Sequence, residues 1–163
     1  MSPTRRNLLL AAGVAPAALA VSAAAAQGSD VAVLERLLAL ERRLEAAYAA
    51  AARRDVIGEQ LALSLRDQER EHARGLELAL ADHGLAEPGV PRPDPRLDAA
   101  LRGRAAFARY ALGLEGRVVR AYIHAEARLR DTGLLRPLGA IMASDAQHAV
   151  ALRQWLGEPL LEV

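Results

Sequence analysis

Two pairs of side chains with the same spacing carry the chemistry of this sequence. Glu69 and His72 lie three residues apart, and so do Asp145 and His148. On a helix, this spacing places a carboxylate and an imidazole on one face, where both can bind the same metal ion. We therefore predict that the two pairs are halves of one metal site, which the rest of the chain assembles.

Two further carboxylates repeat in a matched way. Glu41 is followed seven residues later by Tyr48, and Glu115 is followed seven residues later by Tyr122. Each pair lies in a stripe of apolar residues with helical period. The sequence thus places a Glu/Tyr helix before a carboxylate/His helix twice, which indicates an internal duplication of a helical hairpin.

These polar residues fall on faces that are otherwise apolar. A carboxylate on a core face is costly unless it is paired or bound to a metal. Four carboxylates and two imidazoles are the ligand set of a dinuclear iron or manganese site in a four-helix bundle, since four negative charges offset two divalent ions. The predicted ligands are Glu41, Glu69, His72, Glu115, Asp145 and His148. The competing interpretation is a hydrogen-bonded polar core without metal.

Other titratable residues are predicted to lie outside this site. Glu45 and Glu71 are expected to form surface salt bridges, because Glu45 has no counterpart in the second half and Glu71 points about 160° away from Glu69. His124 is expected on the opposite face of its helix from Glu115, exposed to solvent.

Composition favours an all-α protein. The 163 residues are rich in alanine, leucine and arginine, aromatic residues make up 3%, and there is no cysteine, which excludes disulfides, zinc–thiolate sites and iron–sulfur clusters. The net charge is +1, and the arginines alternate with acidic residues along the chain. We therefore expect a solvated surface without a basic face, and no binding of nucleic acid.

Apolar periodicity predicts a four-helix bundle with a long crossover between its second and third helices. The helices are expected at about residues 30–53, 55–83, 98–130 and 134–156. Asp30 is expected to cap the first helix. The four prolines between residues 84 and 97 favour an extended segment, which is long enough to run from one end of a bundle to the other.

The N-terminal segment, residues 1–26, is typical of a twin-arginine signal peptide. Arg5 and Arg6 precede a weakly apolar run from Leu8 to Ala26, which ends in small residues suited to cleavage. The protein is therefore expected to be exported to the periplasm, cell envelope or extracellular space, with residues 27–163 forming one domain. The alternative is an uncleaved segment that anchors the chain in the membrane.

The chain from about Asp30 to Gly157 resembles the ferritin-like superfamily, which includes bacterioferritin, rubrerythrin and manganese catalase, and is most similar to its small exported members. The resemblance rests on the stretches 40–48, 67–76, 114–122 and 143–152. It implies terminal carboxylates at Glu41 and Glu115 and bridging carboxylates at Glu69 and Asp145. It also implies that His72 and His148 each hold one metal, and that Tyr48 and Tyr122 donate hydrogen bonds across to ligating carboxylates.

One residue departs from the family pattern. Asp145 stands where glutamate is usual and is one methylene shorter, which would weaken a bridge or the second metal site. The resemblance implies an oxidoreductase that uses two iron ions, or manganese, with dioxygen or peroxide, and that depends on a separate electron donor because cysteine is absent. A monomer or a homodimer is expected rather than a storage shell. The alternative is a structural or stress-related protein with a degenerate metal site.

Overall fold

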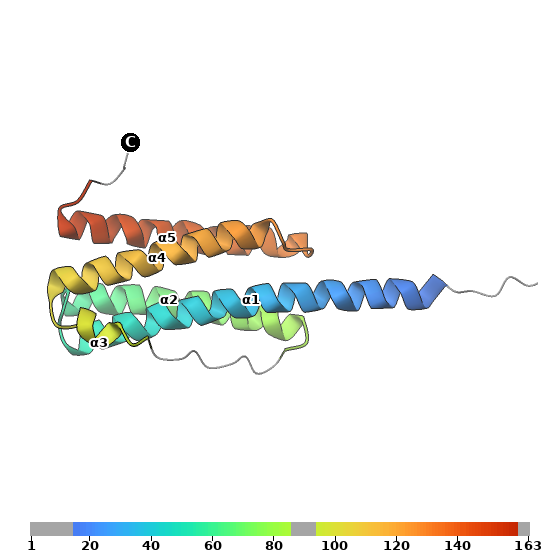
Figure 1. Ribbon diagram of the computed structural model, residues 1–163, viewed down its shortest axis with the longest axis horizontal. Helices are drawn as coiled ribbons and strands as arrows, with labels where there is room; N and C mark the ends of the chain where they lie inside the picture. Colours follow the sequence, from blue (N-terminus) through green and yellow to red (C-terminus); the bar gives the residue numbers. More distant parts are fainter. Residues whose placement is uncertain (1–14, 86–93, 160–163) are drawn as a thin grey trace, which may run out of the picture.

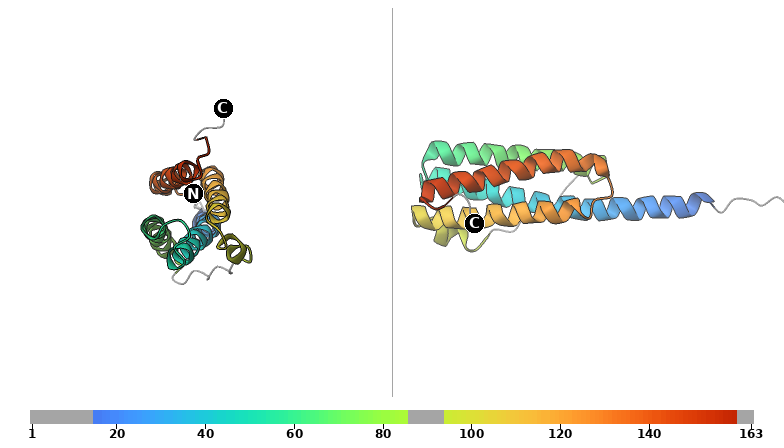
Figure 2. Two further views of the ribbon diagram at one scale, coloured as in Figure 1. Left: turned by 90° about the vertical axis from the view of Figure 1, so that its left-hand side faces the viewer. Right: turned by 90° about the horizontal axis from the view of Figure 1, so that it is seen from above.

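The computed structural model is all-α and describes the backbone of residues 15–85 and 94–159, with side chains described from Asp30 onward. Within these residues, four long helices form a bundle (Figures 1 and 2): α1 (Ala15–Arg53), α2 (Glu59–Asp82), α4 (Arg104–Glu126) and α5 (Leu135–Leu156). A short helix, α3 (Leu97–Ala100), precedes α4, and a 3-10 turn, η1 (Thr132–Leu134), precedes α5. The predicted fold class is confirmed.

The bundle consists of two helical hairpins. Helix α1 packs along α2, helix α4 packs along α5, and the two hairpins meet mainly where α1 lies against α4. Leucines and alanines of all four helices fill the core. Phe107 is fully buried among them and meets the ring of Tyr48 edge to face, with 6.1 Å between the ring centroids. This contact fixes one of the two tyrosines that the sequence places beside the polar core.

The first helix begins earlier than predicted, so the role predicted for Asp30 is wrong. Helix α1 begins at Ala15, because the alanine-rich stretch before Asp30 also favours helix. Asp30 lies inside α1 and is 2% exposed. Its carboxylate accepts hydrogen bonds from the backbone N–H groups of Arg130 and Asp131, in the segment that joins α4 to η1. Asp30 therefore ties the first hairpin to the turn of the second.

Three helix boundaries were also predicted wrongly, and one of them is the end of the third helix, which lies at Glu126 rather than near residue 130. Helix α2 begins at Glu59 rather than near Asp55, because Asp55 (φ 48°) and Gly58 (φ 90°) adopt positive φ angles that no right-handed helix contains. The predicted third helix is divided into α3 and α4, since Gly103 between them has an extended backbone. Glycine is a weak helix former, and Gly103 was the single residue in the sequence that indicated this break.

The ends of the proline-rich segment agree with a long crossover. Helix α2 ends and α3 begins at opposite ends of the bundle (Figure 1). Residues 86–93 of this segment lie outside the described part of the chain, as do Arg5 and Arg6 of the predicted signal peptide. Among the described residues, no helix is both long enough and apolar enough to cross a membrane.

Candidate metal centre

The bundle brings all six predicted ligand side chains to one place. Their donor atoms form two groups, and within each group all the atoms lie within 4.8 Å of one another. The groups are Glu41, Glu69, His72 and Asp145, and Glu69, Glu115, Asp145 and His148. Glu69 and Asp145 belong to both groups, so each is placed where a carboxylate can bridge two ions. Glu41 and His72 belong to the first group alone, and Glu115 and His148 belong to the second group alone.

Glu69 lies between the two histidines. Its Oε1 is 2.8 Å from Nδ1 of His148, and its Oε2 is 3.4 Å from Nδ1 of His72. The two imidazole rings are stacked, with centroids 5.9 Å apart. Both histidines therefore present the same nitrogen to the carboxylates, and Glu69 turns one oxygen toward each half of the site.

The two tyrosines cross from one hairpin to the other. The hydroxyl of Tyr48 in α1 donates a hydrogen bond to Oε1 of Glu115 in α4, at 2.5 Å. The hydroxyl of Tyr122 in α4 donates to Oε1 of Glu41 in α1, at 2.6 Å. The two bonds are equivalent under exchange of the hairpins, which is the structural counterpart of the repeat in the sequence. Each bond fixes the orientation of one unshared carboxylate.

The polar atoms of this cluster are buried, and most lack hydrogen bonds. The four carboxylate side chains are completely buried, and His148 is 4% exposed. Among the described residues, both oxygens of Glu69 and of Asp145 form no hydrogen bond of good geometry, and neither does Oε2 of Glu41 or of Glu115. The Nδ1 atoms of His72 and His148 form none either, although they lie at ion-pair distances of 2.8 to 3.6 Å from the surrounding carboxylates. Buried polar atoms are normally satisfied, so this convergent set of oxygen and nitrogen donors fits divalent metal ions of the iron or manganese type.

Burial also changes the acidity of the cluster. It raises the pKa of Glu41 to about 7, and it raises the pKa values of Glu115 and Asp145 above their usual range. Burial alone lowers the pKa of His72, but the carboxylate of Asp145 and its neighbours outweigh burial and raise that pKa to about 12. Glu115 and Glu69 likewise raise the pKa of His148 to about 9, against the effect of burial. Without metal, both histidines therefore hold protons that partly neutralise the carboxylates.

The two halves differ on their outer side. Nε2 of His148 lies 3.3 Å from Oε1 of Gln68 and 3.4 Å from the hydroxyl of Ser144. His72 instead borders an open hollow, which is also lined by Ser64, Asp67, Gln68 and Glu71. The His148 half is therefore closed by polar contacts, whereas the His72 half faces a path to solvent. Sequence reasoning missed Gln68 and Ser144, although Ser144 lies one helical turn before His148.

The short side chain of Asp145 reaches the site. Its Oδ1 lies 3.2 Å from Nδ1 of His72, and the residue is part of both groups of donor atoms. Asp145 therefore offers an oxygen atom to each group despite its shorter side chain.

The residues predicted to lie outside the site do so. Glu45 pairs with Arg70 at 2.8 Å, and Glu71 pairs with Arg74 at 3.4 Å, as the surface salt bridges expected of them. His124 is exposed on α4.

A comparison with protein families gave a match that covers the whole bundle. The family described as Ferritin-like domain matches residues 29–158, which include all six predicted ligands and both tyrosines. Comparisons with curated proteins and with solved structures gave no significant match.

Proposed function

The chain belongs to the ferritin-like domain family, and from this we propose that it binds two iron or manganese ions and uses them to oxidise ferrous iron or to remove peroxide. The observation that carries the proposal is the buried set of unsatisfied carboxylate and imidazole atoms, which forms two groups joined by Glu69 and Asp145. Four carboxylates offset two divalent cations, and one neutral imidazole completes each set of ligands.

The pair of metals, when bound, supplies the electron-transfer chemistry toward dioxygen or peroxide. The protein contributes charge, geometry and exclusion of water. Tyr48 and Tyr122 hold Glu115 and Glu41 in fixed orientations, while Glu69 and Asp145 keep oxygens directed at both halves. Both histidines must release their protons to become ligands, so metal binding is coupled to proton release.

We further propose that small oxidants reach the site through the hollow beside His72, because this is the half that faces solvent. The electron donor would be a separate molecule, since the chain has no cysteine with which to hold an iron–sulfur or rubredoxin-type centre. Export by the twin-arginine route would place this chemistry in the periplasm, cell envelope or extracellular space, and a homodimer remains our proposal for the assembly.

One observation favours a second candidate, a structural protein whose polar core works without metal. The raised pKa values of His72 and His148 mean that two imidazolium ions can offset part of the carboxylate charge. The two candidates differ in metal content and in turnover of oxidant.

The deciding experiment measures consumption of dioxygen and of peroxide by the full-length chain after addition of ferrous iron or of manganese. The variant His72→Ala/His148→Ala removes one ligand from each half. The matched control is His83→Ala/His124→Ala, which removes two histidines outside the site. We expect turnover above that of the free metal in the wild type and in the control, and its loss in the site variant. Wild-type turnover equal to that of free metal would refute the catalytic proposal.

A further inference from the structure

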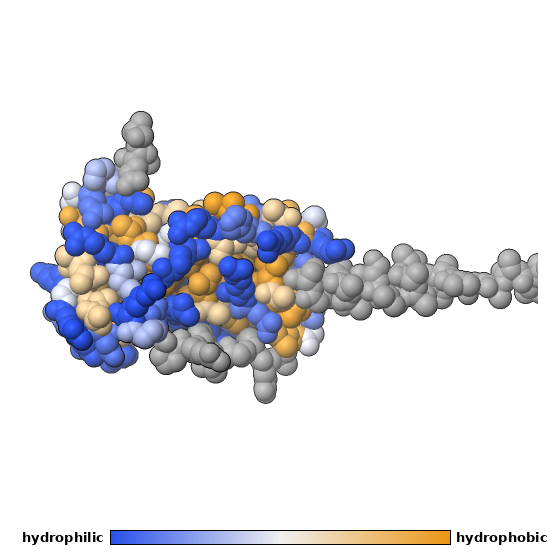
Figure 3. Space-filling model, in the orientation of Figure 1, coloured by the Kyte–Doolittle hydropathy of each residue, from blue (hydrophilic) through white to orange (hydrophobic). Residues whose placement is uncertain are grey.

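A groove lined by basic side chains runs along the seam between α1 and α4, on the face of the bundle shown in Figure 3. Two hollows of about 230 and 390 Å³ share the lining residues Arg36, Ala121 and His124, and are therefore continuous. A third hollow, of about 340 Å³, shares Arg43 and Arg117 with the second. The basic groove, as we call it, is lined by Arg36, Arg43, Arg117, Arg120, His124 and Arg128.

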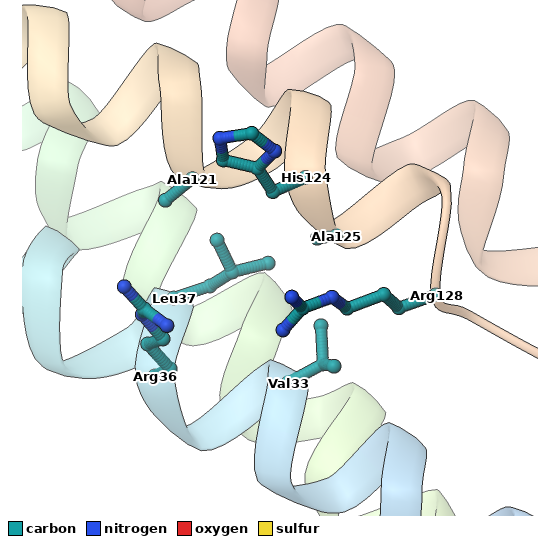
Figure 4. A pocket seen from close by; sticks show the side chains of 7 residues that line it. All are labelled: Val33, Arg36, Leu37, Ala121, His124, Ala125 and Arg128. Atoms are coloured by element: carbon teal, nitrogen blue, oxygen red, sulfur yellow. The ribbon is translucent and has the colours of Figure 1, made fainter.

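The close view shows how the groove is built at one end. Arg36 projects from α1, His124 from α4 and Arg128 from the turn that follows α4, around a hollow whose floor includes Val33 and Leu37 (Figure 4). The guanidinium of Arg128 reaches from this turn toward α1 (Figure 4). The cationic groups therefore surround a small apolar floor and leave its mouth open.

Within the described residues, the arginines of the groove form no salt bridge, although the charge of Arg43 helps to lower the pKa of Asp94. The salt bridges between arginine and a carboxylate in these ranges involve other arginines. At 100° per residue, the acidic residue Glu126 of α4 lies on the opposite side of that helix from Arg117. Asp94 lines the third hollow beside Arg43, so one carboxylate faces the far end of the groove. The sequence expectation of evenly mixed surface charge is wrong for this face.

A second observation concerns a buried donor at the groove. The Nε atom of Arg43 is buried and makes no hydrogen bond within the described residues. A buried N–H group of this kind is normally satisfied by an oxygen acceptor. Guanidinium groups bind phosphate oxygens through paired hydrogen bonds, which makes phosphate a well-matched acceptor for several arginines at once.

We propose that the basic groove binds an extended chain of phosphate groups, of the kind found in linear inorganic polyphosphate. Arg117, Arg120 and His124 lie on α4 within seven residues, which corresponds to about 10 Å of helix. Arg128 follows in the turn after α4, so basic side chains recur at about one per helical turn along the groove. The site lies on the α1/α4 seam and uses none of the predicted metal ligands, so it stands independently of the proposed metal chemistry.

Other occupants fit the groove less well. Single-stranded nucleic acid binds by stacking its bases on aromatic side chains, and the described lining of the groove contains no Phe, Tyr or Trp. A second copy docked symmetrically on the same face would place arginine against arginine. A polyphosphate chain has no bases to stack and no partner surface to pack, so the basic side chains of the groove are sufficient to bind it.

The test measures binding of fluorescently labelled polyphosphate to the full-length chain by anisotropy, at about 0.1 M salt and without free divalent metal. The groove variant is Arg36→Gln/Arg120→Gln/Arg128→Gln. The control variant, Arg53→Gln/Arg102→Gln/Arg136→Gln, makes the same charge change at exposed arginines away from the groove. Circular dichroism verifies that both variants keep their helical content.

We expect the wild type to bind and the control to stay within about twofold of it. The groove variant should bind about 100-fold more weakly, from about fivefold for each of three exposed ion pairs. Absence of wild-type binding, or equal losses in the two variants, would overturn the proposal. Single-stranded DNA and anionic phospholipid vesicles form two further arms. Tighter, groove-dependent binding of either one than of polyphosphate would also overturn it.

Discussion

The crossed tyrosine bonds give the sharpest prediction about the polar core. Tyr48 lies on the same helix as Glu41 but donates its hydrogen bond to Glu115 on the other hairpin. Tyr122 shows the reverse arrangement, with Glu41 as its acceptor. We therefore predict that Tyr48→Phe is energetically coupled to Glu115→Gln and uncoupled from Glu41→Gln in the metal-free protein.

The size of the effect follows from burial. Tyr48 and Glu115 are both completely buried, and Oε2 of Glu115 has no hydrogen bond among the described residues. Tyr48→Phe keeps the ring that packs on Phe107 but leaves that carboxylate without its tyrosine donor. A hydrogen bond to a charged group contributes about 2 kcal/mol. The free energy of unfolding should fall by about that amount, and the Tm by roughly 4–8 °C.

The assay is a double-mutant cycle measured by denaturant unfolding of the metal-free protein. For the pair Tyr48 and Glu115 we expect a coupling energy of about 1–2 kcal/mol. For the pair Tyr48 and Glu41, which serves as the matched control, we expect less than about 0.5 kcal/mol. Equal coupling in the two cycles, or stronger coupling to Glu41, would refute the crossed arrangement.

Three further predictions concern protons, the fold and the outer side of the site. Because the pKa values of His72 and His148 are raised to about 12 and about 9, both hold protons at neutral pH that a metal must displace. Metal affinity should therefore rise between about pH 6 and pH 8, with proton release measurable in weak buffer, and pH-independent affinity would contradict this. Asp30→Ala should lower the free energy of unfolding by about 2 kcal/mol, because it removes the acceptor for two backbone N–H groups, while metal content stays unchanged. Gln68→Ala removes a polar contact of His148 and should weaken metal binding by about tenfold, as titration of the apoprotein will show; unchanged affinity would exclude a positioning role.

The sequence was sufficient for the bundle and for the set of residues gathered in its core. The spacing of Glu69 and His72, and its repeat at Asp145 and His148, depends on helix geometry alone, which the structure retains. The crossing of the tyrosines between hairpins came from family resemblance, since spacing within one helix does not say which partner helix lies opposite.

Other features depended on contacts that no local pattern contains. Asp30 is a residue type that often caps helices. Its carboxylate oxygens instead accept hydrogen bonds from a turn 100 residues away along the chain. The arginines look evenly mixed with acids when read along the sequence, yet packing of α1 against α4 gathers several of them on one seam. Both outcomes were decided by tertiary packing, which overrides local preference.

The number of metal ions bound per chain tests the central claim most directly. Full-length protein isolated after native export, and its Glu69→Ala variant, would be analysed for iron and manganese before and after addition of ferrous iron. Because Glu69 is shared by both groups of ligand atoms, we predict about two ions per chain in the wild type and loss of both in the variant. A wild-type protein that contains no metal and refuses added iron would contradict the account.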